Sequence, residues 1–256
     1  MDLVCPAPDE LLDRWLAEDI GRGDLTAAAL MGQTGFAHWI AKQPGRFCGG
    51  PLVERLFQRL DSRVGVRLLR DDGGAVEVGD RLLELEGPAP ALVAGERTAL
   101  NLAMRLSGIA TVTAELVAQL QGTGVRLADT RKTTPGLRLM EKYAVRCGGG
   151  INHRMGLDDA AMLKENHIAW AGGITAAITA VRSSAPWPAR VIVEAETEAQ
   201  ATEAVQAGAD GVLLDEFTPK QLQVLVPRLR QLAQGGVVLE ASGVQPEQLR
   251  AFATTG

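Results

Sequence analysis

The residues best suited to chemistry lie between Arg131 and Arg154, where cations are concentrated in a chain of net charge −5. Six arginines and lysines stand in this stretch against one acid, Glu141. Such a local excess favours an anionic ligand, and arginine grips carboxylate and phosphate groups through paired hydrogen bonds. We expect Arg131, Lys132, His153 and Arg154 to supply that grip, because they lie in predicted loops rather than on a helix face.

Three further cations of this stretch are predicted to face solvent. Arg138, Lys142 and Arg146 recur every four residues within a helix predicted over 135–147, which is the spacing of an exposed helix face. The glycines at 148–150 follow this helix and have two interpretations. Under one, the first glycine simply ends the helix; under the other, the extra glycines let the backbone approach a ligand or a neighbouring loop closely.

Charged or hydroxyl side chains also follow each of five predicted strands. Strand alternates with helix from residue 125 onward, and this alternation predicts a parallel sheet with right-handed crossovers. The carboxyl ends of such strands converge on one mouth, where barrel enzymes place their active sites. The alternative is a buried ion-pair network that only holds the top of the barrel together. The side chains concerned are Asp129, Arg131, Lys132, Lys164, Glu165, Glu194, Glu196, Asp215, Glu216, Glu240 and Ser242.

The part of the chain before these strands has a different pattern. Apolar residues at helical spacing predict an amphipathic helix over 50–62, and 66–87 has the alternation and Gly-rich turns of short strands. A longer helix, over 95–124, bridges the two regions. We therefore predict a mixed α and β domain over 1–105 that takes in the start of the bridging helix, and a β/α-barrel-like domain over 106–256.

The composition excludes several classes of function. The chain has 256 residues, 46% hydrophobic and 22% charged, so two α/β units can each bury a core. The negative net charge argues against nucleic-acid binding, and no segment is long and apolar enough to cross a membrane. The start of the chain lacks the basic and apolar pattern of a signal peptide.

The cysteines indicate a reducing, cytoplasmic location. Cys5, Cys48 and Cys147 are odd in number and have no metal-ligand spacing. Cys147 has no base beside it in the sequence, so we predict a small core residue rather than a nucleophile.

The stretch ADTRKTTPGLRLMEKYAVRCGGGINHRMGLDDAAMLKENHI resembles the central signature of the quinolinate phosphoribosyltransferase family. The segments AEDIGRGDLT, GERTALNLAMRLSGIAT, VEAET, VLLDEF and LEASG are similar to other parts of the same family. The resemblance implies an α/β fold, with an N-terminal α/β sandwich domain followed by an incomplete parallel β/α barrel, and a homodimer. It also implies a reaction of de novo NAD synthesis, in which quinolinate and phosphoribosyl pyrophosphate give nicotinate mononucleotide, carbon dioxide and pyrophosphate with the help of Mg²⁺.

The resemblance implies a role for each cation of the quinolinate pocket. Arg131, His153, Arg154 and Lys164 are similar to the cations that line the pocket, and Arg97 to an arginine that reaches in from the partner subunit. Decarboxylation leaves a carbanion beside a cationic ring nitrogen. We hypothesise that the Lys164 ammonium stabilises that carbanion, which would make Lys164 a catalytic residue.

The resemblance likewise implies the residues that hold the phosphoribosyl donor. Lys132 is similar to a lysine that contacts the donor, and Glu194 and Asp215 to acids that hold the ribose hydroxyls and the Mg²⁺-bound pyrophosphate. Ser242 and Gly243 are similar to part of a phosphate-binding turn. Lys132, Glu194 and Asp215 are thus expected to be catalytic, with Mg²⁺ held through the bound substrate near the two acids rather than by a protein cage.

Two features depart from the family pattern. Val244 stands where many members have a second glycine after LEASG, which is expected to alter how the turn approaches a phosphate. The sequence stops at AFATTG, whereas the resemblance implies a further strand, a glycine-bearing phosphate loop and a final helix. From the sequence as it stands, we expect an incomplete grip on the donor phosphates.

Three other functions are alternatives to the transferase. A family relative recruited to another role, such as the molybdenum-associated homologues, is disfavoured by the unbroken DTRKTTPG and GGGINHRMGL segments. A barrel lyase would use Lys132 or Lys164 as a Schiff-base amine. A non-catalytic protein would bind quinolinate without turning it over.

Overall fold

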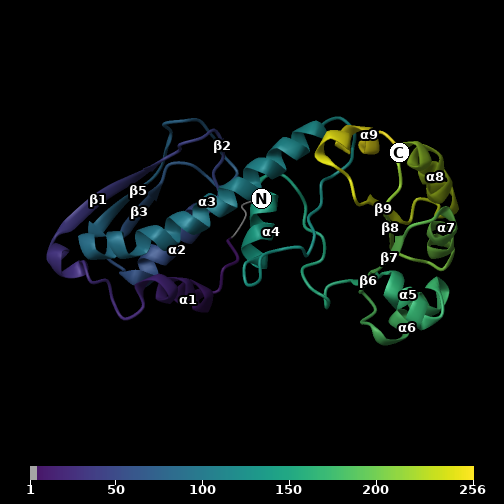
Figure 1. Ribbon diagram of the computed structural model, residues 1–256, viewed down its shortest axis with the longest axis horizontal. Coiled ribbons are helices and arrows are strands. Elements are labelled where there is room, and N and C mark those ends of the chain that lie inside the picture. Colours follow the sequence, from purple (N-terminus) through teal and green to yellow (C-terminus); the bar gives the residue numbers. More distant parts are fainter. Residues whose placement is uncertain (1–4) are drawn as a thin grey trace. The chain divides into compact units, whose positions relative to one another are not determined.

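The computed structural model describes residues 5–256 (Figure 1). The chain divides into two compact units. The first unit consists of the chain up to Ala118 together with Arg126–His153, and the second consists of Gln119–Val125 and Arg154–Gly256. The sequence-based boundary between residues 105 and 106 stays a prediction, because the division by contacts follows the fold rather than a single cut in the sequence. In the described part of the chain, no helix is long and apolar enough to cross a membrane.

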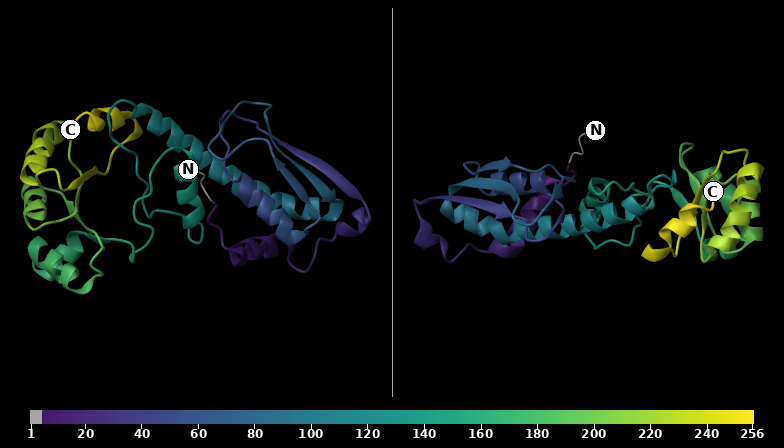
Figure 2. Two further views of the ribbon diagram at one scale, coloured as in Figure 1. Left: turned by 180° about the vertical axis from the view of Figure 1, so that it is seen from behind. Right: turned by 90° about the horizontal axis from the view of Figure 1, so that it is seen from above.

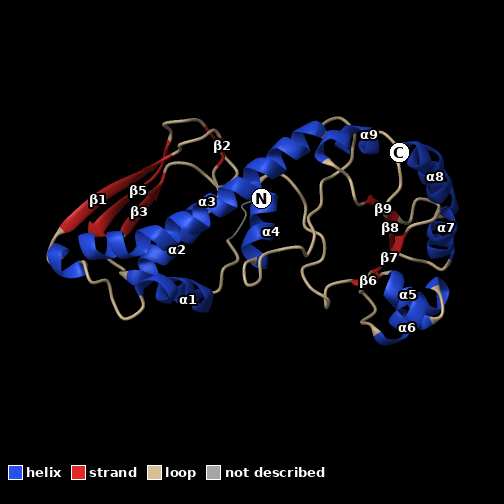
Figure 3. Cartoon of the chain, in the orientation of Figure 1, coloured by secondary structure: helices blue, strands red, loops and turns tan. Residues whose placement is uncertain are grey.

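The first unit is built on an antiparallel sheet with the strand order β1-β5-β3 (Figure 3). The central strand β5 pairs along its length with β1, and its neighbour on the other side is β3. The short strands β2 and β4 pair with each other in a separate antiparallel ladder. The strands are β1 (Thr34–Ile40), β2 (Gly45–Arg46), β3 (Gly65–Leu68), β4 (Ala75–Val76) and β5 (Arg81–Pro88).

The α-helices described in the first unit are α1 (Asp9–Ile20), α2 (Gly50–Leu60), α3 (Ala89–Gln119) and α4 (Arg138–Cys147). The helix α2 packs on α1 and β3, and the long helix α3 runs beside the sheet (Figure 2). Leu52, Leu56 and Phe57 of α2 are almost fully buried, which is the amphipathic face that the sequence predicts. A Cβ atom at Gly95 of α3 would lie 2.7 Å from the Phe57 ring, so this glycine sets how closely α2 and α3 approach.

A half-buried carboxylate, that of Asp72, ties α2 to α4. Asp72 Oδ1 accepts hydrogen bonds from the Gly49 and Gly50 amides, at 2.9 and 2.8 Å, and so caps the amino end of α2. Its Oδ2 accepts a 2.7 Å hydrogen bond from the Tyr143 hydroxyl on α4. Burial raises the pKa of Tyr143, and the Asp72 carboxylate raises it further. Cys147 is buried beside this group, as the sequence predicts for a small core residue.

The second unit holds a parallel sheet with the strand order β6-β7-β8-β9. The strand β8 is a continuous apolar run, and β7 is apolar except for Glu194, as expected where helices cover a parallel sheet. The strands are β6 (Ala161–Leu163), β7 (Val191–Ala195), β8 (Gly211–Leu214) and β9 (Val238–Ala241). The helices are α5 (Glu165–Ala171), α6 (Ile174–Ser184), α7 (Glu198–Gln206), α8 (Pro219–Leu232) and α9 (Leu249–Ala253).

Two sequence-based predictions of local structure fail. The predicted strand at residues 125–130 is absent, because this segment makes only an isolated bridge between Ala128 and Ile151 in the first unit. The short helix α5 was not predicted. It begins directly after Lys164, whose backbone N–H donates a 3.1 Å hydrogen bond to His167 Nδ1 and closes the first turn.

Candidate active site

The carboxyl ends of the parallel strands carry the polar side chains that the sequence places there. Lys164 directly follows β6, Glu194 lies near the end of β7, and Asp215 follows β8. Ser242 follows β9, the last strand of the sheet. Because neighbouring parallel strands end side by side, these four residues share one edge of the second unit.

Each of these side chains has a partner from the neighbouring strand. Lys164 Nζ forms an ion pair with Glu194 Oε2, and the Ser242 hydroxyl donates a hydrogen bond to Asp215 Oδ1. The Lys164 side chain is 48% exposed and Glu194 is 14% exposed, so the lysine reaches from solvent over a mostly covered carboxylate. The structure therefore brings together two pairs of residues that the sequence assigned to the site, with complementary polarity in each pair.

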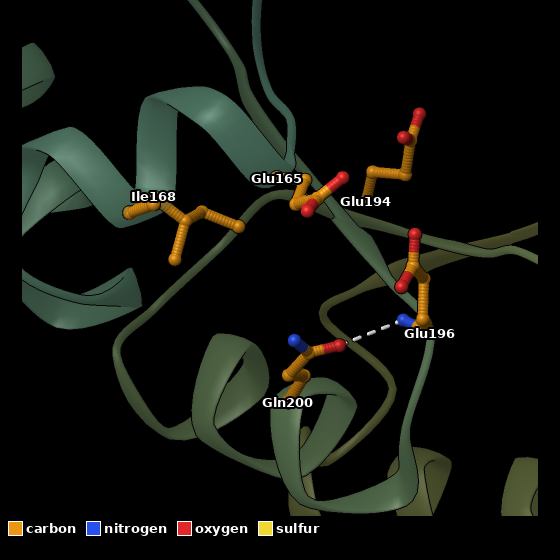
Figure 4. Close-up of a pocket in the computed structure, with 6 residues that line it drawn as sticks. Glu165, Ile168, Glu194, Glu196 and Gln200 are labelled. Carbon is orange, nitrogen blue, oxygen red and sulfur yellow. Dashed lines mark hydrogen bonds between the residues drawn. The ribbon is translucent and has the colours of Figure 1, made fainter.

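A cavity of about 150 Å³ opens beside the Lys164–Glu194 pair. Figure 4 shows Glu165, Glu194 and Glu196 around it, with Ile168 of α5 on one side. The Gln200 side chain accepts a 2.8 Å hydrogen bond from the Glu196 backbone amide and so orders the turn between β7 and α7. Three carboxylates line this cavity, which makes it acidic apart from the lysine at its edge.

The backbone is tightly constrained just beyond β8 and β9. Glu216, the residue after Asp215, has φ of 60°, a left-handed conformation that is uncommon for a residue with a side chain. Gly243 has φ of 72°, and a Cβ atom placed there would lie 3.6 Å from Glu216 Oε1. The Ser242 amide donates a 3.2 Å hydrogen bond to the Leu214 carbonyl. The two turns are thus joined, which fixes Asp215 and Ser242 in place.

A second group of predicted site residues lies in the first unit, around a buried ion pair. Lys142 Nζ pairs with Asp129 Oδ1, and the two side chains are only 1% and 8% exposed. This corrects the prediction that Lys142 shares a solvated face with Arg138 and Arg146. Arg146 is exposed, but Arg138 is half-buried and donates a hydrogen bond to a loop threonine. The four-residue spacing does place the three cations on one helix face. Lys142 is nevertheless buried, because its ammonium pairs with Asp129, which lies outside α4.

His153 is held through its backbone by this ion pair. Its N–H donates a 2.9 Å hydrogen bond to Asp129 Oδ1, and its carbonyl accepts a 3.0 Å hydrogen bond from Lys142 Nζ. Arg131 and Lys132 follow Asp129 after one intervening residue, with Arg131 half-buried and Lys132 exposed. The loop that carries Arg131 and Lys132 and the segment that carries His153 are therefore both anchored at the ion pair of Lys142 and Asp129.

The loop after Lys132 is anchored by a contact between α3 and α4. Arg105 donates hydrogen bonds to Glu141 Oε1, one of them from its Nε atom at 2.8 Å, and Glu141 Oε2 accepts the Thr134 amide at 3.1 Å. Burial raises the pKa of Glu141, but the hydrogen bonds from Arg105 and Thr134 outweigh burial and hold the pKa below its ordinary value. Sequence reasoning gave neither residue a role, since the pairing crosses 36 positions.

The two remaining predicted arginines lie in different units. Arg154 belongs to the second unit, where its Nη1 donates a 2.8 Å hydrogen bond to the Ala160 carbonyl. Arg97 is exposed on α3 of the first unit. The structure thus groups Arg131, Lys132 and His153 in the first unit with Arg97, and the other predicted residues in the second.

The glycines after α4 prove to be packing residues. A Cβ atom on Gly148 would lie 2.5 Å from the Ala110 carbonyl oxygen of α3, and one on Gly150 would lie 2.7 Å from Val145. Gly149 has φ of 89°, the left-handed conformation that follows many helices. The helix α4 ends at Cys147 with Gly148 as its cap, as the first interpretation holds. The close approach of the second interpretation is made to α3 and to the end of α4, and not to a loop.

Two sequence profiles match the chain almost from end to end. The profile of the quinolinate phosphoribosyl transferase N-terminal domain matches residues 24–107, and that of the C-terminal domain matches residues 109–256. The chain belongs to the quinolinate phosphoribosyltransferase family. The family resemblance drawn from the sequence is therefore confirmed, and with it the fold of an N-terminal α/β sandwich and an incomplete parallel barrel.

Individual relatives match nearly the whole of this chain and most of their own length. A probable carboxylating nicotinate-nucleotide pyrophosphorylase of Bacillus subtilis is 45% identical over 249 residues, which are 96% of this chain and 85% of the relative. The human carboxylating nicotinate-nucleotide pyrophosphorylase is 39% identical over 242 residues, 90% of this chain and 80% of the relative. The crystal structure of NadC from Streptococcus pyogenes superposes with a TM-score of 0.90 at 38% identity, covering 98% of this chain and 89% of that one.

Proposed function

We propose that this enzyme transfers the phosphoribosyl group of phosphoribosyl pyrophosphate to the ring nitrogen of quinolinate and then releases carbon dioxide. The products are nicotinate mononucleotide and pyrophosphate. The observation that carries the proposal is the match of both family domains, together with relatives named as carboxylating nicotinate-nucleotide pyrophosphorylases. That family activity favours group transfer over the barrel-lyase interpretation. The predicted roles of individual residues remain proposals, and the polar strand ends support them.

Quinolinate carries two carboxylates, and the cations of the site suit such a ligand. We assign its binding to Arg131, His153, Arg154 and Lys164, with Arg97 supplied by a second subunit. Arginine binds a carboxylate in a planar, bidentate manner, and lysine offers a compact charge on a flexible stem. The Lys164 side chain is about half exposed, so its ammonium can exchange Glu194 for an anionic ligand.

The phosphoribosyl donor requires both negatively and positively charged protein groups, the former near its sugar and the latter near its phosphates. Loss of pyrophosphate builds positive charge on the sugar carbon, and the carboxylates Glu194 and Asp215 at the strand ends suit that charge. These acids also accept hydrogen bonds from ribose hydroxyls. We assign the donor phosphates to Lys132 and to the turn formed by Ser242 and Gly243, where φ of 72° at Gly243 opens the backbone to a ligand.

The carboxylates of the second unit also fit Mg²⁺, which prefers oxygen ligands and keeps several of its waters. Glu194 and Asp215 stand at adjacent strand ends, and Glu165 and Glu196 line the same cavity as Glu194. We propose that Mg²⁺ would enter with the donor pyrophosphate and that Glu194 and Asp215 would help to hold it. When bound, it would neutralise charge on the departing pyrophosphate.

Decarboxylation follows ribosylation of the ring nitrogen. The bond from the ring to the neighbouring carboxylate breaks, carbon dioxide leaves, and the electron pair stays on the ring carbon until a proton replaces it. The cationic ring nitrogen stabilises this carbanion from within the substrate. We propose that the Lys164 ammonium adds to that stabilisation, because its side chain is about half exposed at the strand ends and carries a positive charge.

One face of α3 supports the proposed homodimer. Val93, Arg97 and Met104 share this face by their spacing, and the two apolar side chains are 48% and 60% exposed. An exposed apolar stripe around an arginine suits an interface in which that arginine reaches into the partner's site. The free thiols of Cys5, Cys48 and Cys147 accord with a reducing cytoplasmic location.

The direct test is formation of nicotinate mononucleotide from quinolinate, phosphoribosyl pyrophosphate and Mg²⁺. We expect product that depends on all three, and a large loss of activity in Arg131→Ala. Calorimetry with quinolinate alone separates binding from turnover. Intact quinolinate binding without product would favour the non-catalytic interpretation, and absence of both would refute the proposed activity.

A further inference from the structure

The ion pair between Lys142 and Asp129 has no direct access to a substrate. Lys142 lies on α4 with 1% of its side chain exposed, and Asp129 is 8% exposed. Burying two charges is costly unless further hydrogen bonds satisfy them, and apolar residues of similar size often replace such pairs without loss of stability. Stability alone therefore does not explain why the chain has a buried ion pair at this position.

The hydrogen bonds around the pair converge on one short segment. Asp129 accepts from the His153 amide at 2.9 Å and from Asn152 Nδ2 at 2.7 Å, in addition to Lys142. Lys142 Nζ donates to the His153 carbonyl at 3.0 Å. Asn152 Nδ2 also donates to the Lys142 carbonyl at 2.8 Å. The backbone of His153 is thus held at both its N–H and its C=O.

Both ends of this network lead directly to cations assigned to quinolinate. Asp129 precedes Arg131 by two residues, and His153 is followed by Arg154. The segments of Asp129 and His153 are also joined by backbone hydrogen bonds around the Ala128–Ile151 bridge. A shift of either segment would move a guanidinium or imidazole relative to the other.

We infer that Lys142 and Asp129 are positioning residues that set the geometry of the quinolinate-binding cations. This inference rests on the proposed function, because it takes the roles of Arg131 and His153 from there. Neither member of the pair touches the substrate. Their charge holds the loop of residues 129–132 and the segment of residues 152–154 in one arrangement, so that Arg131 and His153 meet the two carboxylates together.

The inference predicts that loss of the Lys142–Asp129 pair affects the binding of quinolinate more than the binding of the phosphoribosyl donor. The acids and the turn assigned to the donor, Glu194, Asp215 and Ser242, lie in the second unit with partners of their own. Lys132 lies close to Asp129, but its amide donates a 3.1 Å hydrogen bond to Thr130 Oγ1, which fixes it locally. Loss of the buried pair should therefore weaken quinolinate binding and leave donor binding nearly unchanged.

The test is the double variant Lys142→Met, Asp129→Asn, which removes both charges and keeps side chains of similar size. We expect the KM for quinolinate and its calorimetric Kd to rise at least about tenfold, because a small misplacement of binding groups costs up to about 100-fold. The KM for phosphoribosyl pyrophosphate and the kcat should stay within about threefold. Arg146→Met is the matched control, since it removes an exposed cation one turn further along α4 and should change neither constant.

A milder variant covers the case in which the double variant fails to fold. Asn152→Ala removes the two hydrogen bonds of the amide group and should raise the quinolinate KM in the same direction by a smaller factor. If the folded variants lose only stability, with the quinolinate KM and Kd unchanged, the pair is merely structural and the inference is wrong. Failure of the proposed function is distinguishable, because it would appear as absence of product in the unmodified enzyme. Calorimetry with quinolinate would still test the positioning role.

Discussion

Replacing Lys164 by alanine should cost catalysis far more than stability. The Lys164 ammonium pairs with Glu194, but its side chain is 48% exposed, and exposed ion pairs contribute only about 0–1 kcal/mol to folding. We therefore expect the free energy of unfolding to fall by about 1 kcal/mol or less. A hydrogen bond to a charged group is worth about 1.5–3 kcal/mol. Its loss from substrate binding corresponds to a decrease in kcat/KM of roughly 10-fold to 150-fold.

The assay pairs steady-state kinetics with chemical denaturation of the same protein samples. Lys164→Arg keeps the charge and should recover part of the activity. Arg228→Ala is the matched control, because Arg228 forms an ion pair with Glu198 in the same unit, with side chains 63% and 56% exposed. It should lose as little stability as Lys164→Ala and retain full kcat/KM.

Two results would refute parts of this reasoning. A decrease in kcat/KM of less than about threefold in Lys164→Ala would mean that the ammonium does not meet the substrate, since even one charged hydrogen bond is worth more. A raised KM with an unchanged kcat at saturation would leave Lys164 a binding residue only. The proposed stabilisation of the carbanion would then be wrong.

Three further changes test the packing that supports the site. Asp72→Ala should lower the free energy of unfolding by about 2–4 kcal/mol, measured by denaturant titration, because the carboxylate both caps α2 and accepts the Tyr143 hydroxyl. The hydrogen bonds from Arg105 and Thr134 keep the pKa of Glu141 below its ordinary value despite burial, so Glu141 stabilises the fold above about pH 4.3 and loses that contribution as the pH falls through its folded-state value. Glu141→Gln should therefore flatten the loss of stability on acidification, measured between pH 3 and 6. Gly148→Ala places a Cβ atom 2.5 Å from a carbonyl oxygen of α3 and should lower the Tm, with a cost of about 1–3 kcal/mol.

Each of these changes has a control and a contradicting result. Asp72→Asn keeps an acceptor for the helix cap and should cost less than the alanine variant; equal costs would deny the hydrogen-bonding role. An unchanged acid profile in Glu141→Gln would show that other groups govern acid unfolding. Gly108→Ala lies on α3 where an added Cβ meets nothing within 4 Å, so its Tm should not fall. A similar fall at both glycines would contradict the packing argument.

The sequence predicted the structure best where a local pattern of apolar and polar residues is enough to determine a strand or a helix face. Apolar runs followed by polar residues predicted β7 and β8, and the same pattern placed Glu194 and Asp215 at the strand ends. These positions follow from the parallel sheet itself, because successive strands point the same way. The amphipathic face of α2 was equally local, since its burial needs only one partner surface.

Prediction from the sequence failed where burial or secondary structure depends on a residue that is distant in the sequence or on a specific side-chain contact. Lys142 has the spacing of a solvated helix face, and its burial depends on the carboxylate of Asp129, 13 positions away, and on the carbonyl of His153. Residues 125–130 have the composition of a strand but make a single bridge. The start of α5 depends on the contact between His167 and the Lys164 amide, which no propensity reveals.

The pairing of Lys164 with Glu194 has a consequence for how the two substrates bind. These two side chains neutralise each other, yet we assign them to different ligands. A ligand that takes the ammonium alone leaves the carboxylate without its counter-charge, and the reverse holds for a ligand that takes the carboxylate. Each substrate therefore removes part of the penalty that the other must overcome. The two should bind more tightly together than their separate affinities suggest, and by linkage each should enhance the affinity for the other by the same factor.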